Sequence, residues 1–347
     1  MRWAQRHSGI ARPVVLAMLS GALLLGLVAG SPSAVARPRA DQGVDLNIPW
    51  AIGGMRYERD GTLREFPGEW PTVPVRSLRL WDTRTAWLNL EPAQDQWDFS
   101  RLDPFVALAE SHDVEQVTLV LAGTPGWAAQ RLLASDAVWL GPGSASPPRE
   151  MADWRDFVGT VTARYRGRID AYEIWNEPTD RIFWNGTIAE WAGMVASASA
   201  VIRQADPAAA VIASGMAVGS PEDVTSAGPW LVALGAAEPN LTALSFHFYP
   251  VTRAATSTLR HVIVHVRDLA RRNGLPTEVW VTEINVLGGA SWTTRQQRAV
   301  VRSLVSQADA ARVPRLFWYA WTDLTEPSLL PLQPGSPAAR ELTRLLS

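Results

Sequence analysis

From about residue 44 onward, short apolar runs alternate with longer segments in which apolar and polar residues recur at helical spacing. Apolar runs of four to eight residues bounded by turn residues predict buried strands, and segments with a period near 3.6 predict amphipathic helices. We predict strands at Val44–Pro49, Val75–Trp81, Gln116–Ala122, Ile169–Asn176, Ala209–Gly215, Leu241–Phe248, Glu278–Glu283 and Arg315–Trp321.

Amphipathic segments lie between these runs, and Ser100 and Thr293 are candidate caps for two of them. They include Asp103–Ser111, Met151–Tyr165, Thr187–Gln204, Ala255–Asn273 and Thr293–Ala310. Eight strands alternating with helices over about 300 residues predict an α/β fold, a single-domain (β/α)₈ TIM barrel. An open doubly wound sheet is disfavoured because no glycine fingerprint follows the first strand.

Two long insertions, residues 51–74 and 123–150, follow the first and third predicted strands. Both are rich in turn-forming residues, which predicts loops rather than further barrel elements. In such barrels the loops after the strands carry the active site. We therefore expect both insertions on the functional face.

The N-terminus has the layout of a secretory signal peptide. Arginines precede an apolar run from Val14 to about Gly30, and Ala34-Val35-Ala36 offers a cleavage site with small residues. The run also approaches membrane-spanning length, so an uncleaved signal anchor remains an alternative. We expect residues 1–36 to be the signal segment, residues 37–347 to be the barrel, and the barrel to be secreted or on the extracytoplasmic surface.

Composition excludes several classes of chemistry. The chain has no cysteine and no lysine, which excludes thiolate nucleophiles, disulfides and Schiff-base lysines. Its formal net charge of −2 gives no support for a nucleic-acid partner. Only His261 and His265, of five histidines, have helical i, i+4 spacing, and a solvated helix face explains them, so we predict no metal site and no cofactor.

Two glutamates end predicted strands. Glu177 lies in Ile174-Trp175-Asn176-Glu177-Pro178, and Glu283 closes the run that begins at Val279. They belong to the fourth and seventh strands, nearly opposite each other across the mouth. Such a pair suits glycosidic bond cleavage, which needs one protonated and one charged carboxyl group. A retaining enzyme would hold them about 5–5.5 Å apart and an inverting one about 6.5–9.5 Å apart.

Strict strand alternation places Glu173, Trp175 and Glu177 on one face and Asn176 on the other. Glu173 is then either a buried structural acid or the acid/base itself. The 17 tryptophans suit stacking on sugar rings, with Trp127 a leading candidate for such contacts.

The chain resembles the clan A superfamily of retaining glycosidases. The Asn-Glu-Pro triplet at 176–178 matches that clan's acid/base motif. The segment from Arg79-Leu80-Trp81 to Leu102-Asp103 and the run Thr124-Pro125-Gly126-Trp127-Ala128 resemble its family 39-like and family 5-like members. The resemblance covers about residues 44–322 and is specific for the clan but weak for any one family or substrate.

The resemblance implies roles for individual residues. Glu177 would be the acid/base, Glu283 the nucleophile, and Asn176 a ligand of the hydroxyl beside the reacting carbon. Arg79 would hydrogen-bond the nucleophile. The remaining residues implied are His247 and Tyr249, reaching the nucleophile, and Trp321, under the reacting sugar. From the residues alone, Arg79 as a structural ion-pair partner and His247 as an ordinary core histidine stay open.

The sequence thus predicts a secreted, monomeric, retaining O-glycoside hydrolase of an oligo- or polysaccharide, touching a membrane only through a possible N-terminal anchor. The alternative is a non-catalytic carbohydrate-binding barrel of the cell surface or of polysaccharide export. An esterase of the nucleophile-elbow type is disfavoured, because no Gly-x-Ser-x-Gly occurs.

Overall fold

The computed structural model describes residues 44–47, 55–57, 63–65, 70–71, 73–81, 83–133, 140–320 and 329–346. All of them belong to one compact unit, Pro38–Ser347. The expected signal segment, residues 1–36, lies outside the described residues.

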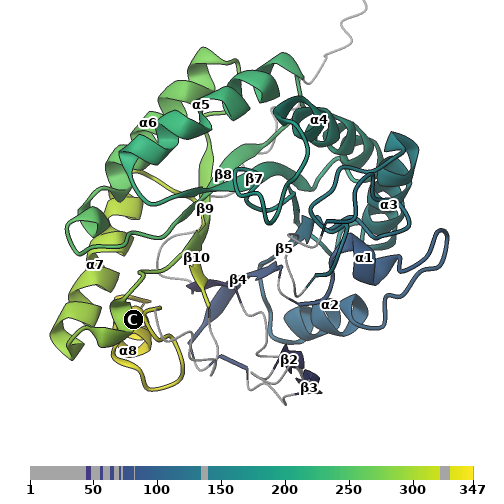
Figure 1. The fold of residues 1–347 in the computed structure, drawn as a ribbon. Helices are drawn as coiled ribbons and strands as arrows, with labels where there is room; N and C mark the ends of the chain where they lie inside the picture. Colours follow the sequence, from purple (N-terminus) through teal and green to yellow (C-terminus); the bar gives the residue numbers. More distant parts are fainter. Residues whose placement is uncertain are drawn as a thin grey trace, which may run out of the picture. The chain divides into compact units, whose positions relative to one another are not determined.

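Eight parallel strands close into a barrel, as the alternating pattern predicts (Figure 1). The first strand pairs with both the last strand and the second barrel strand, which completes the ring. Every strand expected from the sequence overlaps one of the eight. In ring order they are β1 (Val44–Asn47), β4 (Val75–Leu80), β5 (Gln116–Leu121), β6 (Ala171–Ile174), β7 (Ala210–Val218), β8 (Ala243–Phe248), β9 (Val279–Ile284) and β10 (Leu316–Tyr319).

Helices follow the barrel strands from β4 to β10 and surround the barrel, which confirms the TIM-barrel prediction (Figure 1). They are α1 (Trp87–Leu90), α2 (Leu102–Ser111), α3 (Met151–Arg164), α4 (Ile188–Ala205), α5 (Pro221–Ala236), α6 (Leu259–Arg272), α7 (Thr294–Ala310) and α8 (Pro337–Leu346). Two 3₁₀ turns, η1 (Ala255–Ser257) and η2 (Gly289–Ser291), precede α6 and α7.

Local details depart from the expectations in two places, and one expected cap is confirmed. A short antiparallel hairpin, β2 (Met55–Tyr57) and β3 (Leu63–Glu65), lies in the first insertion, where only loop was expected. The predicted Ser100 cap is wrong, because α2 begins after Arg101 with no side-chain cap. Thr293 does cap α7, in a capping box with Gln296.

The barrel interior is layered. Its lower layer is a small apolar cluster drawn from five adjacent strands, namely Ala171, Ile212, Ala243, Trp280 and Phe317. Two residues further along their strands lie Glu173, Ser245 and Thr282, all buried. Because strand side chains alternate with a period of two, these polar residues share the inner face with the apolar layer beneath them. The interior therefore changes from apolar to polar toward the carboxyl ends of the strands.

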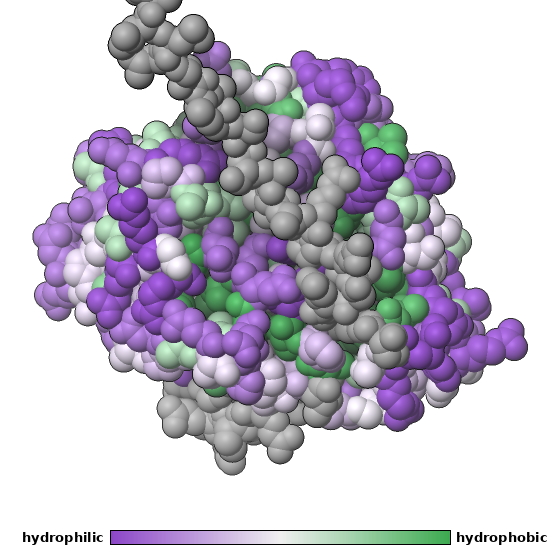
Figure 2. All heavy atoms as spheres, turned by 180° about the vertical axis from the view of Figure 1, so that it is seen from behind, coloured by the Kyte–Doolittle hydropathy of each residue, from purple (hydrophilic) through white to green (hydrophobic). Residues whose placement is uncertain are grey.

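A larger apolar core fills the space between the sheet and the helices, with Trp154, Phe157 and Trp191 fully buried in it. One face of the molecule is hydrophilic around its edge and carries apolar residues toward its middle (Figure 2). Among the described residues, no helix is both long and apolar enough to span a bilayer.

Candidate active site

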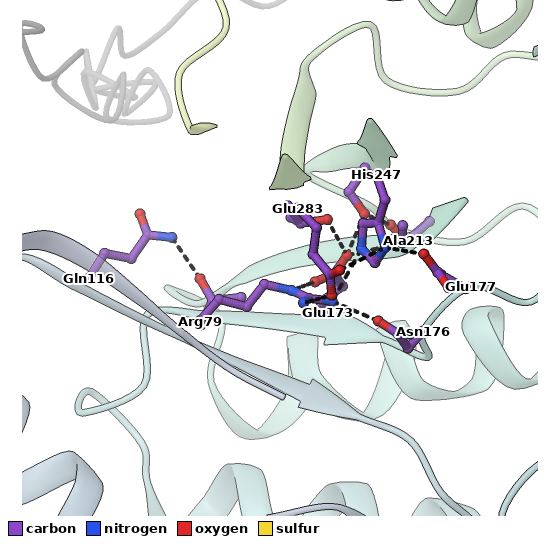
Figure 3. A network of polar contacts seen from close by, with 12 residues as sticks. Arg79, Gln116, Glu173, Asn176, Glu177, Ala213, His247 and Glu283 are labelled. Atoms are coloured by element: carbon purple, nitrogen blue, oxygen red, sulfur yellow. Dashed lines mark hydrogen bonds and ion pairs between the residues drawn. The ribbon is translucent and has the colours of Figure 1, made fainter. Parts of the chain in front are cut away.

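The polar layer of the barrel is organised around the guanidinium of Arg79, on β4 (Figure 3). Its Nε donates to Glu173 Oε2 at 2.5 Å, Nη1 to Glu283 Oε1 at 2.6 Å, and Nη2 to Asn176 Oδ1 at 2.9 Å. Arg79 is fully buried. A buried arginine is tolerated only with such charged and polar partners, so the fold places two carboxylates beside it.

An irregularity in strand pairing explains how Glu283 reaches Arg79. The register between β8 and β9 shifts between Phe246 and His247, so that Phe246 pairs with Val281 and His247 pairs with Glu283. Such a bulge lets two consecutive residues turn toward the same side. Thr282 and Glu283 therefore both make contacts inside the barrel.

The backbone after β6 also leaves the regular strand pattern. Trp175 has φ of 76° and Glu177 has φ of 40°, both in the left-handed region that bulky side chains rarely adopt. Trp175 packs against Trp154 of α3 on the outer side, whereas Asn176 turns inward to Arg79. The prediction that Trp175 shares a face with Glu173, and that Asn176 faces away, is therefore wrong. The cause is that the strand ends at Ile174.

Glu177 and Glu283 meet through His247, on β8. His247 Nδ1 lies 2.7 Å from Glu177 Oε1 and 3.5 Å from Glu283 Oε2. One carboxylate oxygen of each glutamate and the imidazole nitrogen all lie within 4.8 Å of one another. The Glu177 side chain is 16% exposed and that of Glu283 is 7% exposed, so Glu177 has the greater access to solvent and Glu283 is nearly buried.

Glu283 has the stronger set of donors. Tyr249 Oη donates to Glu283 Oε2 at 2.6 Å, opposite the Arg79 bond to Oε1. Burial, together with the charge of Glu283, raises the pKa of Tyr249 well above its usual value, so its phenol stays protonated and available as a donor. Charge-assisted bonds of this kind stabilise an ionised carboxylate.

The protonation of His247 follows from its neighbours. Arg79 Nη2 lies 3.4 Å from Nε2 and Glu177 Oε1 lies 2.7 Å from Nδ1, so both a neutral imidazole that accepts from Arg79 and a protonated one would donate to Glu177 from Nδ1. Burial lowers the pKa of His247, but the charge of Glu283 and the hydrogen bond to Glu177 outweigh it, and the net shift is upward. The imidazole is thus a proton donor toward the mouth.

Glu173 is a buried, ionised acid. Burial raises its pKa, but the charges of Arg79 and His247, with the hydrogen bonds from Ser245 and Arg79, lower it overall. It has no solvent exposure. Of the two interpretations left open by the sequence, the structure supports a structural acid, because Glu173 lies below the mouth and its oxygens are already occupied.

Among the residues that the structure describes, two groups of carboxylate and histidine side chains have the proximity of metal ligands. In the group of Glu177, His247 and Glu283, the imidazole nitrogen that faces the carboxylates, Nδ1, already makes a hydrogen bond with Glu177 at 2.7 Å. In the other group, Glu91, Asp95 and Asp156, both Glu91 oxygens already accept hydrogen bonds, from Trp87 Nε1 and from the backbone N–H of Asp95.

Of the two predicted sugar contacts, Trp127 makes its polar and ring contacts away from the carboxylates. Trp127 donates its indole N–H to the Glu91 carbonyl and packs edge-on against Trp87, at 6.1 Å between ring centroids. Trp321 lies outside the described residues. The stacking roles of both stay predictions.

Three residues with no role predicted from the sequence hold Glu173 in place. Gly215 N–H, Ser245 Oγ and Thr282 Oγ1 all donate to Glu173 Oε1. A Cβ at Gly215 would lie 2.2 Å from His247 Nε2, so only glycine leaves room for the imidazole. A glycine at the end of a predicted strand is the one signal that indicated a close approach here.

Comparison with known proteins agrees with this geometry. Residues 81–324 match the family described as Cellulase (glycosyl hydrolase family 5). No curated protein matches the sequence.

Solved structures with the same fold include a glucosidase from Croceicoccus marinus (13% identity, TM-score 0.61, covering 78% of this chain and 60% of that one). A monomeric beta-xylosidase from Caulobacter crescentus CB15 aligns at 15% identity and a TM-score of 0.61, over 78% of this chain and 61% of that one. Xylanase 10B from Thermotoga maritima aligns at 16% identity and a TM-score of 0.59, over 88% and 95% of the two chains.

At these identities the likeness shows the fold alone. The chain spans about 60% of the length of the first two structures. The family match covers most of the chain, and the barrel brings to its mouth one glutamate that follows the fourth strand and one on the seventh. The protein therefore belongs to the family described as Cellulase (glycosyl hydrolase family 5), a family of clan A.

Proposed function

We propose that the protein is a retaining O-glycoside hydrolase of oligo- or polysaccharides, with Glu283 as nucleophile and Glu177 as acid/base. The observation that carries the proposal is the separation of the two carboxylates. One oxygen of each lies within 4.8 Å of the other, which favours the close spacing of a retaining pair over the wider spacing, about 6.5–9.5 Å, that admits the water of an inverting enzyme.

The unequal surroundings of the glutamates support the assignment of roles. Glu283 accepts from Arg79 and Tyr249, each at 2.6 Å, so two donors hold its carboxylate in one orientation beside a cation. Glu177 is more exposed, and its contact is with a group that can exchange a proton, His247 Nδ1 at 2.7 Å. A carboxylate that is fixed in orientation beside a cation suits a nucleophile, and a more accessible carboxyl group near a proton donor suits an acid/base.

The reaction then proceeds in two displacements. In the first, a Glu283 oxygen bonds to the anomeric carbon as the bond to the leaving oxygen breaks, and Glu177 gives its proton to that oxygen. In the second, Glu177 takes a proton from water, the water oxygen bonds to the anomeric carbon, and the ester to Glu283 breaks. Asn176, held by Arg79, would bind the hydroxyl beside the reacting carbon.

The experiment is a screen of the purified mature chain against aryl glycosides and cell-wall polysaccharides, with product anomericity followed by NMR. We expect retention of configuration with at least one substrate. Glu283→Ala and Glu177→Ala should each lower kcat/KM by several orders of magnitude without unfolding, and azide should partly restore the Glu283 variant. Inverted products, or full activity in either variant, contradict the proposal. Saccharide binding without release of reducing ends would instead support a carbohydrate-binding barrel.

We further propose that residues 1–36 are removed on secretion and that the mature chain is a monomer. N-terminal sequencing of the exported protein tests the first point, and size-exclusion chromatography with light scattering tests the second. An intact N-terminus on exported protein would support the signal anchor instead.

A further inference from the structure

Glu173 cross-links the barrel interior beneath the carboxylate pair. It lies on β6, and its Oε1 accepts from Gly215 N–H at 3.0 Å, Ser245 Oγ at 2.6 Å and Thr282 Oγ1 at 2.8 Å. These donors come from β7, β8 and β9 in turn. One oxygen of Glu173 is thereby fixed to three neighbouring strands.

The other oxygen of Glu173 faces Arg79. Oε2 accepts the Nε–H of Arg79 at 2.5 Å, and both side chains are fully buried. The Nη1 and Nη2 groups of the same guanidinium reach Glu283 and Asn176 at 2.6 and 2.9 Å. A guanidinium is planar and rigid, so fixing the Nε edge also fixes the directions of the two Nη groups.

The distribution of charge also links the ionisation of Glu173 to the position of Glu283. Arg79 carries one positive charge and contacts two carboxylates, Glu173 and Glu283. While Glu173 is ionised, the cation is shared, and Glu283 is held without a closed one-to-one ion pair. If Glu173 were neutral, Arg79 would be attracted to Glu283 alone, which would move the nucleophile and reduce its reactivity.

We infer that Glu173 is a positioning residue of this glycoside hydrolase: anchored to β7, β8 and β9, it holds Arg79 so that Glu283 and Asn176 face the substrate. Glu173 does not touch the reacting atoms and acts through Arg79. The inference rests on the proposed roles of Glu283 and Asn176.

The test is a kinetic double-mutant cycle with Glu173→Gln and Arg79→Met. The glutamine keeps an oxygen for the three donors but turns its NH₂ toward the Arg79 Nε–H, so two donors face each other. We expect kcat to fall about 10- to 100-fold, with KM changed less than threefold, since the lost interaction acts on the chemical step. In the Arg79→Met background the same substitution should change kcat less than threefold, because the residue through which it acts is gone.

A second readout separates positioning from stability. We would measure the rate constant for inactivation of the folded enzyme by a 2-deoxy-2-fluoro glycoside. In Glu173→Gln this rate constant should fall by about the same factor as kcat. Tyr172→Phe is the matched control, because Tyr172 is the neighbouring residue on β6 and packs in the outer core. We expect that variant to stay within twofold of the wild type.

Three results overturn the inference: unchanged kcat in folded Glu173→Gln, a loss carried by KM alone, or additive effects with Arg79→Met. If Glu173→Gln does not fold, Thr282→Val replaces it, because this variant removes one hydrogen-bond donor to Glu173 and keeps the charge of Glu173. We expect kcat of Thr282→Val to be three- to tenfold lower than that of the wild type, and an unchanged kcat refutes the inference.

The activity of the wild-type enzyme distinguishes the two proposals. If the wild type is neither active nor inactivated, the proposed function is wrong. If the wild type is active and kcat of Glu173→Gln is unchanged, only the positioning role of Glu173 is wrong.

Discussion

Glu341 on the C-terminal helix α8 forms ion pairs with arginines of α7, and the structure predicts how much stability is lost when its charge is removed. Glu341 has no solvent exposure, and its carboxylate accepts from Arg298 Nε at 2.7 Å, Arg302 Nη1 at 2.9 Å and Arg344 Nη2 at 2.7 Å. Burial raises the pKa of Glu341, but the hydrogen bonds from the three arginines outweigh it and lower the pKa to about 2. Glu341→Gln removes the charge while keeping the size.

The expected cost follows from the shift. A fall from 4.5 to about 2 corresponds to about 3.4 kcal/mol at about 1.36 kcal/mol per unit. The arginine side chains are 44–53% exposed, so solvent screens much of this energy. We therefore expect Glu341→Gln to lower the free energy of unfolding by about 1–2 kcal/mol at pH 7.

The pH dependence has a definite sign. Because the folded-state pKa is lowered, the stabilisation is complete above about pH 4.5 and is lost as the pH falls toward 2. Urea unfolding of wild type and variant at pH 7 and pH 3, followed by tryptophan fluorescence, measures both effects. The difference between the two proteins should shrink at pH 3.

The control is Glu110→Gln. Glu110 pairs with Arg168 at 2.7 Å, but its side chain is 51% exposed, so the substitution should cost less than about 1 kcal/mol. Equal stability of Glu341→Gln and wild type at pH 7, or a difference that does not change between pH 7 and pH 3, would refute the reasoning.

Two further predictions concern the site. Tyr249→Phe removes one charge-assisted donor to Glu283, so we expect kcat/KM to fall about 10- to 100-fold with an unchanged melting temperature; a change under twofold would contradict the role of the phenol. Gly215→Ala places a Cβ 2.2 Å from His247 Nε2 and should lower kcat by at least tenfold. Gly159→Ala on α3, whose added Cβ meets its nearest neighbour at 3.5 Å, is the matched control and should leave kcat unchanged.

The fold was predictable because its signal is periodic. Short segments rich in apolar residues recur between the helical segments, and each barrel strand overlaps its predicted range, as for Gln116–Leu121. Helix α5 (Pro221–Ala236) was not singled out. It contains Pro229 and Gly228, which oppose a helix in sequence-based prediction, and its apolar face supplies the stability that propensity does not.

The site was predictable in its residues more than in its geometry. The sequence places Glu177 and Glu283 at strand ends, but strict alternation gives Asn176 the wrong face. The left-handed backbone at Trp175 and the bulge before Glu283 decide where these side chains point, and both depend on tertiary packing. The link from Glu173 to Arg79 joins residues 94 positions apart, so no local pattern indicates it.

The most direct test of the central claim is to trap the covalent intermediate. The wild-type enzyme would be inactivated with the 2-deoxy-2-fluoro analogue of its best aryl glycoside, digested, and mapped by mass spectrometry. We predict one glycosyl group per molecule, in ester linkage to Glu283. A label on Glu177 or on any other residue would contradict the account, as would an active enzyme that forms no adduct and releases product of inverted configuration.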